Sequence, residues 1–408
     1  MKILLSDGSG LTARQVAGRL SESGHEVEAL SPGWMCLCRF TRHVRRVHPV
    51  PSYGADPLGW LDAALAVYRA GGFDVLFPTQ EQVAALSHSA GRLLAAGIRT
   101  AVPPFEALRA LQDKVSASAT LGALGLPQPQ TAFLRTADDL RKWRNFPVFI
   151  KTPIGTATAG VRRVDSAAAL AAYAGELADA VFAGGGVIAQ EPAEGPLVMA
   201  QSVFVRGEMV AAHANLRVRE GARGGASHKR SANEPAVVVK HLDSLGRSLR
   251  WHGGLSADAI LTDAGPVFID INPRLVEPGN AWRSGVDLVG PLLDAACGRV
   301  PQAQPPGRPG VATHQLLLAA LGAGADGRGR RGVAAEILGA LTHTGSYRGS
   351  AEELTPVRGD PLAALPVLVA AVAMLIRPAL WSWFAGGSVA GYALTPAGWD
   401  SLLNMPPA

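Results

Sequence analysis

The segment FIDINPRLVEP, residues 268–278, places three polar side chains at a spacing that suits the chemistry of charged substrates. Asp270, Asn272 and Arg274 occupy alternate positions, so in a β-strand they share one face. The carboxylate and the amide oxygen are ligands for a hard cation, and the guanidinium can hold an oxyanion. The structural alternative is that Asp270 and Asn272 only end a strand in a turn before Pro273.

A second carboxylate is expected to face this segment. Asp258 and Asp270 are each six residues from Ala264, the centre of a predicted hairpin turn, so we expect them to pair across its two strands. Asn272 lies two residues further along, on the same face. Two adjacent carboxylates are destabilising unless a cation neutralises them. The oxygen ligands favour Mg²⁺, as one ion or two, with Mn²⁺ as the alternative metal.

Two lysines have surroundings that suit a polyphosphate. Lys151 ends a predicted strand and precedes TPIGTATAG, a loop of small residues at 152–160. An ammonium group beside loop amides can hold phosphate oxygens. Lys114 precedes an Ala-rich helix, and Gln190-Glu191 ends another apolar strand, where an adenine could pair with free backbone groups. Taken alone, each lysine is more typical of an ordinary surface residue.

A basic segment, residues 215–235, precedes the predicted hairpin and contains Arg217, Arg219 and His228. A run of charge is usually a solvated loop. A glycine pair in this segment would let the backbone approach a ligand closely. We therefore favour Arg217 or Arg219 as a contact for a substrate carboxylate or a phosphate group, with His228 as a further candidate.

Composition restricts the class of protein. The chain has 408 residues, 48% hydrophobic and 17% charged, which is typical of a globular protein with two or three domains. The net charge of +5 comes without a block of Lys and Arg, so we expect a basic cleft for an anionic ligand and no nucleic-acid partner. The three cysteines form no even framework and predict a reducing compartment.

The elements that position these residues follow two patterns. Strands and helices alternate over the first hundred residues, from KILL at 2–5 to DVLFPT at 74–79, which predicts a parallel sheet. Short strands and hairpin turns dominate from about 106 to 300. Residues 301–310 are rich in Pro and Gly and are typical of a linker, and residues 322–332 predict a mobile loop.

The tail is strongly apolar. Residues 362–376 form an apolar run interrupted by Pro366, and the run is shorter than the roughly 20 residues of a spanning helix. This pattern predicts a packed pair of C-terminal helices. The alternative is an anchor that lies on a membrane or docks a partner, with Trp381, Trp383 and Phe384 at the interface.

The motifs, taken in order, resemble the ATP-grasp superfamily, most closely its carboxylate–amine ligases and its carbamoyl-phosphate-synthase-like proteins. The likeness rests on Lys114, Lys151 with its loop, Gln190-Glu191, Asp258 and Asp270-x-Asn272-x-Arg274, and it covers about residues 1 to 300. It implies an α/β fold with an N-terminal Rossmann-like domain at 1–105 and an ATP-grasp domain at 106–300. The small lobe would span about 115–190 and the large lobe about 191–300, followed by a linker and loop at 301–332 and an apolar helical extension at 333–408.

The resemblance also implies a role for each position. Lys114 and Lys151 would hold the α- and β-phosphates of ATP, and Arg274 would stabilise an acyl phosphate and a tetrahedral intermediate. Asp258, Asp270 and Asn272 would ligate Mg²⁺. A loop containing Thr156, Ala157 and Gly160 would close over the phosphates, while Gln190, Glu191, Ala193 and Glu194 would border the adenine and the ribose. Both metal acids are Asp where Glu is common in the family, and Pro192-Ala193 replace its usual aromatic–aliphatic pair.

These roles imply an ATP-dependent, ADP-forming ligase that joins a small carboxylate, such as an amino acid, to an amine through an acyl phosphate. Its partners would be small molecules, its location the cytoplasm and its assembly a homodimer, as is frequent in the resembling family. One alternative is an enzyme that uses bicarbonate as the acid, which dependence on bicarbonate would identify. The other is a membrane-associated ATP-binding protein with a regulatory role. It would lose membrane association, but not ATP binding, on removal of residues 360–408.

Overall fold

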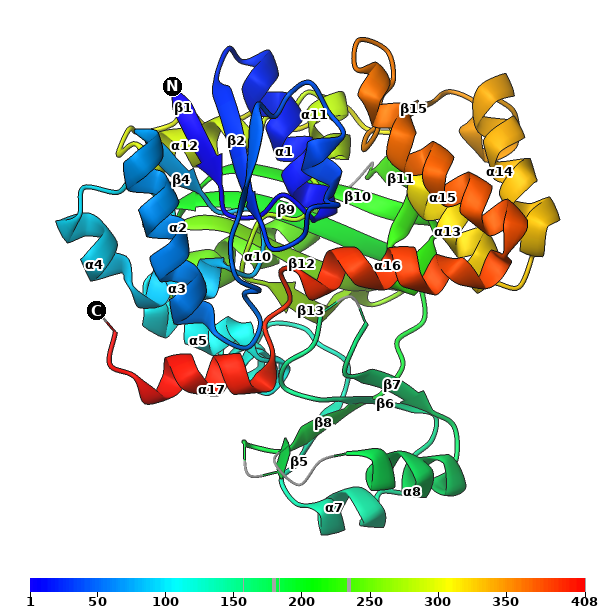
Figure 1. Ribbon diagram of the computed structural model, residues 1–408. Coiled ribbons are helices and arrows are strands. Elements are labelled where there is room, and N and C mark those ends of the chain that lie inside the picture. Colours follow the sequence, from blue (N-terminus) through cyan, green and yellow to red (C-terminus); the bar gives the residue numbers. More distant parts are fainter. Residues whose placement is uncertain (157, 178–180, 183, 233–235, 408) are drawn as a thin grey trace.

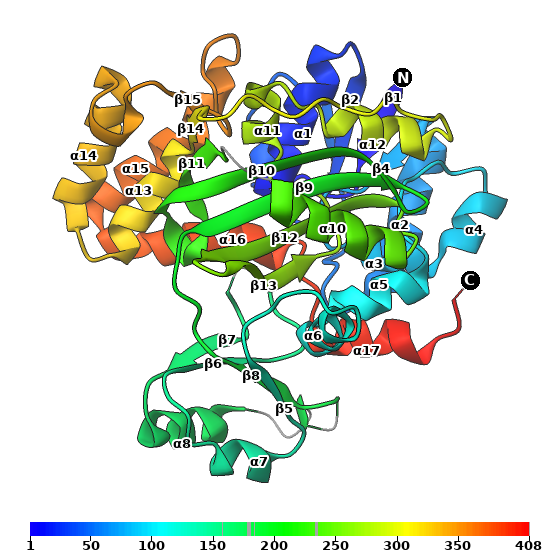
Figure 2. The ribbon, with the colours of Figure 1, turned by 180° about the vertical axis from the view of Figure 1, so that it is seen from behind.

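The chain forms three β-sheets, which the computed structural model describes for residues 1–156, 158–177, 181–182, 184–232 and 236–407 (Figure 1). The N-terminal sheet and the large sheet contribute side chains to one apolar core, which also contains residues of α1 and α12. The small sheet, β5 to β8, projects from these two layers in both ribbon views (Figure 2). The residues predicted to bind a nucleotide meet between the small sheet and the large sheet.

The N-terminal sheet is parallel throughout, as the alternation of strands and helices predicted, with the order β3-β2-β1-β4. Ile3 and Leu5 enter the core that contains α1, whereas Leu4 enters the core that contains α2. A parallel strand covered on both faces must be apolar throughout, which explains the run KILL. The elements are β1 (Lys2–Leu5), α1 (Leu11–Glu22), β2 (Glu26–Ser31), η1 (Leu37–Arg39), β3 (Arg46–Pro49), α2 (Pro57–Gly71), β4 (Val75–Phe77), α3 (Val83–His88) and α4 (Ala90–Ala95).

The small sheet is antiparallel, with the order β5-β8-β6-β7. Leu140 of α7 and Leu170 of α8 pack with its apolar side chains and cover its outer face. Two helices that precede this sheet, α5 and α6, pack instead against the large sheet. The elements are α5 (Phe105–Gln112), α6 (Lys114–Ala123), β5 (Thr131–Leu134), α7 (Ala137–Lys142), β6 (Val148–Lys151), β7 (Val161–Val164), α8 (Ala167–Glu176) and β8 (Val187–Gln190).

The large sheet has the order β13-β12-β9-β10-β11-β14-β15 and contains both predicted hairpins, β9–β10 and β12–β13. Helix α10 lies in front of it in Figure 2, and its Leu242 and Leu245 pack with Phe204 and Trp251. The elements are β9 (Leu197–Val205), β10 (Glu208–Glu220), η2 (Ala222–Gly224), β11 (Ala226–Ser231), α10 (Ala236–Ser248), β12 (Gly253–Thr262), β13 (Gly265–Asn272), α11 (Gly279–Ser284) and α12 (Val289–Ala296).

Residues 301–308 have no regular secondary structure, in keeping with the expected linker, whereas the chain beyond 310 extends the large sheet and forms helices where a loop was expected. Strand β14 (Ala312–His314) pairs with β11, and β15 (Ser350–Glu352) pairs with β14. The expected mobile loop at 322–332 contains the end of α13 (Leu316–Ala325) and the start of α14 (Gly329–Thr342). A Cβ on Gly322 would lie 3.0 Å from the Cα of Gly221, so glycine here serves close packing rather than a turn.

Three helices complete the chain and cross the front of the molecule (Figure 1). Ala370, Ala371 and Met374 of α15 pack against α13, in agreement with the predicted packing of the tail. Leu394, before α17, and Trp399 within it join the apolar core beneath α2. The elements are η3 (Gly345–Tyr347), η4 (Pro361–Ala363), α15 (Ala364–Ile376), η5 (Pro378–Leu380), α16 (Trp381–Ala390) and α17 (Pro396–Asn404).

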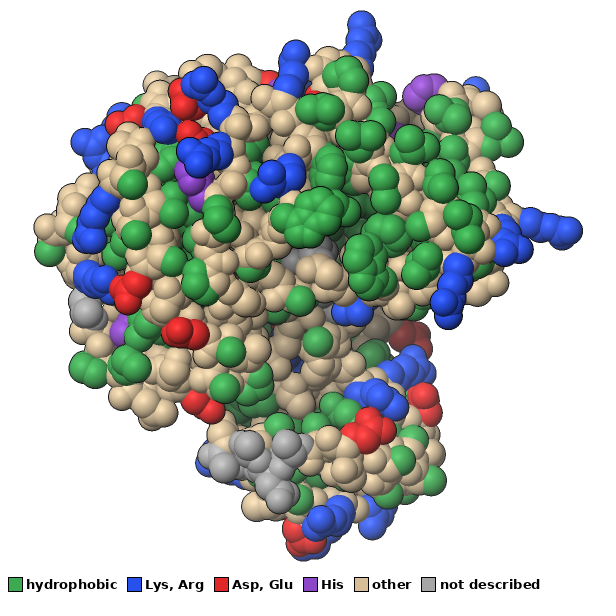
Figure 3. All heavy atoms as spheres, viewed as in Figure 1, with side chains coloured by type: hydrophobic (Ala, Val, Ile, Leu, Met, Phe, Trp, Pro, Cys, Tyr) green, Lys and Arg blue, Asp and Glu red, His purple; other side chains and the backbone are tan. Residues whose placement is uncertain are grey.

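The helices of the apolar tail are short. Within the described ranges, no helix has both the length and the apolar character needed to cross a bilayer. Helix α15 has 13 residues. Hydrophobic side chains gather on the surface over α15 and α16 (Figure 3), where Leu368, Val372 and Ile376 are exposed.

Candidate active site

A cavity of about 690 Å³ lies between the small and large sheets and extends to the N-terminal sheet and the C-terminal helices. Its size is typical of small-molecule sites (~300–1,000 Å³). Most of the predicted site residues line it, although they are spread along the chain: Lys114, Lys151, Thr156, Gln190, Glu191, Ala193, Arg217, Asp258, Asp270, Asn272 and Arg274. The fold thus brings the nucleotide, metal and oxyanion candidates to one place.

The pairing of the two carboxylates depends on a β-bulge. Thr262 pairs with Gly265, so the turn is two residues long, and an uninterrupted register would place Asp258 opposite Ile269. A register shift between Asp258 and Ala259 places Asp258 opposite Asp270 instead. The predicted pairing is therefore confirmed, but a bulge produces it rather than a symmetrical turn around Ala264.

Asp258 and Asp270 form a like-charged pair in the cavity wall. Burial, followed by the charge of Asp270, raises the pKa of Asp258 to about 7. In the part of the chain that the structure describes, no group of three or more His, Cys, Asp or Glu side chains could hold a metal ion. A metal here would bind two carboxylates and the amide oxygen of Asn272. This oxygen set, with its excess negative charge, fits a Mg²⁺ ion that keeps several waters.

The two lysines approach the carboxylates from different elements. Lys151 Nζ donates to the carbonyl of Ile269, the extra residue of the bulge, at 2.6 Å and to Gln190 Oε1 at 2.7 Å. Burial lowers the pKa of Lys151 to about 8, against the opposing charge of Asp270. Lys114 Nζ lies 3.2 Å from Asp270 Oδ1. Two ammonium groups therefore lie beside the candidate metal ligands. This arrangement suits a phosphate-bearing ligand that binds together with a metal ion.

The loop after Lys151 contacts the N-terminal domain. Thr156 Oγ1 donates to Glu81 Oε1 at 2.5 Å. Gly160 has a positive φ of +77°, and its carbonyl accepts from the Thr152 N–H at 2.8 Å. Gly160 supports the loop without lining the cavity, and Ala157 lies outside the described residues. Thr156 thus reaches both the cavity and the N-terminal domain, and Ile154 of the same loop does so too.

The candidate adenine edge lies at the end of β8. Glu191 and Ala193 line the cavity, whereas Glu194 is exposed and does not. The Glu191 N–H donates to the Gln130 carbonyl at 2.9 Å and is therefore already paired. An adenine at this edge would have to use other backbone groups of the segment.

The structure separates the three substrate candidates. Arg217 lines the cavity and donates to the Gly224 carbonyl at 2.8 Å. Arg219 pairs with Glu336 of α14, and His228 packs against His314. Neither Arg219 nor His228 lines the cavity. A bulge in β10 between Arg217 and Arg219 breaks the alternation that would have kept the two arginines on one face.

The buried histidine pair leads to a prediction for acid stability. Burial lowers the pKa of both His228 and His314 to about 4. Both values lie below the ordinary histidine value of about 6.5, so the folded state favours the neutral rings. Their contribution to stability is complete above about pH 6.5 and is lost as the pH falls toward 4. Between pH 7 and pH 5, we expect the melting temperature of His228→Phe to fall less than that of the wild type.

Thermal melts over this pH range check that expectation. His343→Asn is the control, because His343 is exposed and has a left-handed backbone that asparagine tolerates. An equal drop in melting temperature for the wild type and both variants would contradict the assignment of acid sensitivity to the buried pair.

Two cavity residues carried no recognisable signal in the sequence. The Glu81 carboxylate accepts from Thr156 and from the Leu394 N–H, and it lies 3.7 Å from Arg274. Tyr392 is buried at the cavity wall. Burial raises the pKa of its phenol well above the ordinary value, and the charge of Arg274 acts in the opposite direction. Only the folded chain shows that these residues surround Arg274.

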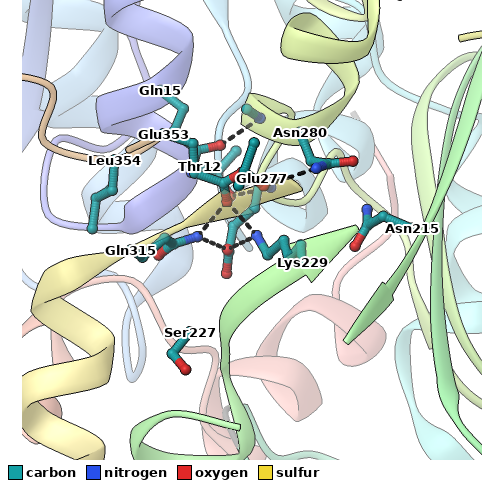
Figure 4. Close-up of polar contacts among 12 residues, drawn as sticks. Thr12, Gln15, Asn215, Ser227, Lys229, Glu277, Asn280, Gln315, Glu353 and Leu354 are labelled. Atoms are coloured by element: carbon teal, nitrogen blue, oxygen red, sulfur yellow. Dashed lines mark hydrogen bonds and ion pairs between the residues drawn. The ribbon is translucent and has the colours of Figure 1, made fainter. Parts of the chain in front are cut away.

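A buried ion cluster supports the segment that follows Arg274 (Figure 4). Lys229 Nζ lies 2.5 Å from Glu277 and 2.7 Å from Glu353, and Gln315 donates to the same two carboxylates. Burial alone would lower the pKa of Lys229, but the two carboxylates raise it well above its ordinary value. Because Glu277 also lines the cavity, the cluster fixes one of its walls to β11 and to the start of α13.

Comparisons with known proteins bear on the fold. No protein-family model and no curated protein matches the chain. Among solved structures, it resembles the biotin carboxylase domain of the 2-oxoglutarate carboxylase from Hydrogenobacter thermophilus, in complex with MgADP, ADP and bicarbonate. The TM-score is 0.60 at 18% identity, over 76% of this chain and 73% of that one.

Two further structures give the same result. Biotin carboxylase from Campylobacter jejuni matches with a TM-score of 0.60 at 16% identity, over 76% of this chain and 74% of that one. N5-carboxyaminoimidazole ribonucleotide synthetase from Thermus thermophilus matches with a TM-score of 0.57 at 19% identity, over 78% of this chain and 83% of that one. All three neighbours have the same architecture of an N-terminal domain followed by an ATP-grasp domain. The chain described here therefore has the ATP-grasp fold.

Proposed function

We propose that this protein is an ATP-dependent, ADP-forming ligase that joins a carboxylate to an amine through an acyl phosphate. One observation carries the proposal: Lys114, Lys151, Asp258, Asp270 and Arg274 line a single cavity of small-molecule size. These groups supply the cations for a polyphosphate, the ligands for a divalent metal and a guanidinium for an oxyanion.

In this proposal the nucleotide lies between the small and large sheets. Lys114 and Lys151 hold its α- and β-phosphates, and Thr156 belongs to the loop over them. The adenine lies against the backbone of Glu191 to Ala193 at the end of β8. Asp258, Asp270 and Asn272 hold Mg²⁺, or Mn²⁺ in its place, and the bound metal offsets the negative charge of the phosphates.

The reaction follows from the low electrophilicity of a carboxylate at neutral pH. A carboxylate oxygen attacks the γ-phosphorus of ATP, and ADP leaves as the bond to its β-phosphate oxygen breaks. The amine then attacks the acyl carbon, loses a proton and displaces inorganic phosphate. Arg274 stabilises the charge on the acyl phosphate and on the tetrahedral intermediate. Closure of the loop that contains Thr156 would exclude water, which would otherwise hydrolyse the intermediate.

A second candidate uses bicarbonate as the acid. It is favoured by the neighbour from Hydrogenobacter thermophilus, whose structure contains bicarbonate beside MgADP. The product would then be a carbamate or a carboxylated acceptor rather than an amide. Both candidates use the same nucleotide site, so they differ only in the acid that the cavity accepts.

ADP release from Mg·ATP distinguishes the two candidates. The full-length protein is assayed with a panel of carboxylates, amino acids and amines, singly and in pairs, with bicarbonate as a separate arm. Release that requires one carboxylate and one amine, with a matching amide detected by mass spectrometry, supports the ligase. ADP release that requires bicarbonate supports the second candidate instead of the amide-forming ligase. Tight ATP binding without release under any condition overturns both.

A further inference from the structure

The cavity has an apolar compartment that a nucleotide does not need. Its walls include Met35 and Phe40 from the N-terminal domain, Leu321 from α13, Leu365 and Val369 from α15, and Trp383 from α16. Helices α15 and α16 come from the tail, which follows the last strand of the large sheet. The tail thus encloses the site on one side, and it does so with hydrophobic side chains.

These side chains present uncovered apolar surface. Met35 is 44% exposed, Val369 47% and Trp383 64%. Apolar groups that line a cavity and stay uncovered favour an apolar ligand, because burying their surface is the main favourable term in such binding. Bicarbonate, a phosphate or a small polar amino acid would leave this surface in contact with water.

The apolar compartment is continuous with the reacting centre. Arg274, Asn272 and the buried Tyr392 line the same cavity as Val369 and Trp383. The segment between α16 and α17 is tied to this centre, because the Leu394 N–H donates to Glu81 at 2.8 Å and Glu81 lies 3.7 Å from Arg274. A molecule with a charged head at Arg274 and an apolar group toward α15 and α16 would match both ends.

We propose that the carboxylate substrate carries a large apolar group, aliphatic or aromatic, which the compartment between α13, α15, α16 and residues 35–40 binds. This inference rests on the proposed ligase, since it names the class of acid that the ligase activates. The carboxylate head lies at Arg274, and the apolar group contacts Leu321, Val369 and Trp383. The tail of the chain therefore selects the substrate.

A binding series tests the proposal without turnover. Straight-chain carboxylates of four, six and eight carbons are titrated into the full-length protein in the presence of Mg·ADP, with calorimetry as the readout. Burial of each methylene is expected to tighten binding about fourfold, the ratio that corresponds to about 0.8 kcal/mol. Octanoate has four more methylenes than butanoate and should then bind ~250-fold more tightly. Equal affinity for the three acids, or no binding of any, overturns the proposal.

Two valines on one helix provide a matched pair of variants. Val369 lines the cavity and is 47% exposed, whereas Val372 does not line it and is 48% exposed. Val369→Asp should lower the affinity for octanoate at least ~10-fold, because it places a charge against the hydrocarbon chain of the ligand. Val372→Asp should leave that affinity within about twofold of the wild-type value. If the aspartate variant at 369 does not fold, Val369→Thr is used, with a smaller loss in the same direction. Equal losses at the two positions contradict the compartment.

The failure of this inference differs from the failure of the ligase. Chain-length-dependent binding without any ADP release would keep the apolar compartment and remove the proposed reaction. ADP release with small polar acids, without preference for chain length, would keep the reaction and remove the compartment.

Discussion

Asp270→Asn is expected to lower the rate constant of ADP release on the order of 10³-fold. The substitution keeps the volume of the side chain but removes one of the two carboxylates proposed to hold the metal. It also removes the negative partner of Lys114, whose Nζ lies 3.2 Å from Asp270 Oδ1. The variant should need a higher Mg²⁺ concentration for its remaining activity, since one charged ligand has been lost.

Steady-state assays over a Mg²⁺ series measure both effects. The same hairpin offers the control, because Asp263 lies in its exposed turn, away from the cavity. Asp263→Asn should leave both the rate and the Mg²⁺ dependence unchanged. Wild-type kinetics in Asp270→Asn would exclude Asp270 from the metal site.

Arg274→Met is expected to have the second largest effect, a fall in kcat of ~10²–10³-fold with ATP affinity changed by less than about threefold. The guanidinium is proposed to act on charge that develops after ATP has bound, whereas Lys114 and Lys151 hold the nucleotide itself. Arg274→Lys should recover only part of the loss, because an ammonium group supplies the charge without the planar pair of donors.

The arginine variants are compared by ADP release and by calorimetric binding of ATP. Arg247→Met is the matched control, since Arg247 lies exposed on α10 and pairs only with Asp243 of the same helix among the described residues. A parallel loss of ATP affinity and kcat in Arg274→Met would show that Arg274 binds the nucleotide rather than the intermediate.

Local patterns in the sequence predicted the parts of the site that lie on neighbouring strands. The alternation of Asp270, Asn272 and Arg274 placed them on one face, and a hairpin assumed to be symmetrical around Ala264 placed Asp258 opposite Asp270. Both inferences used only the period of a strand and the length of a turn. The bulge that corrects the register leaves no mark in the residue types, so its presence required the structure.

Longer-range features were not predictable in the same way. The sequence grouped Arg217 with Arg219, but a bulge and the ion pair with Glu336 separate them. Glu81 and Tyr392 reach Arg274 from opposite parts of the chain, so no spacing or motif joins them. The glycines from 322 onward indicated a loop because glycine usually does, but Gly322 and Gly324 lie within α13 and permit close packing. Gly327 does lie in a turn, between α13 and α14, with a positive φ.

The docking of α17 on the N-terminal domain has a consequence for synthesis of the protein. Thr395 donates a hydrogen bond to the carbonyl of Gly54, and the two residues are 341 positions apart. At about 5–20 residues per second, a ribosome needs roughly 17–70 s to add that length of chain. During this interval the apolar cluster around Tyr53 and Trp60 lacks Trp399 and Leu402, which complete it in the finished protein. The speed of translation therefore sets how long the nascent chain displays a surface that can aggregate or recruit a chaperone.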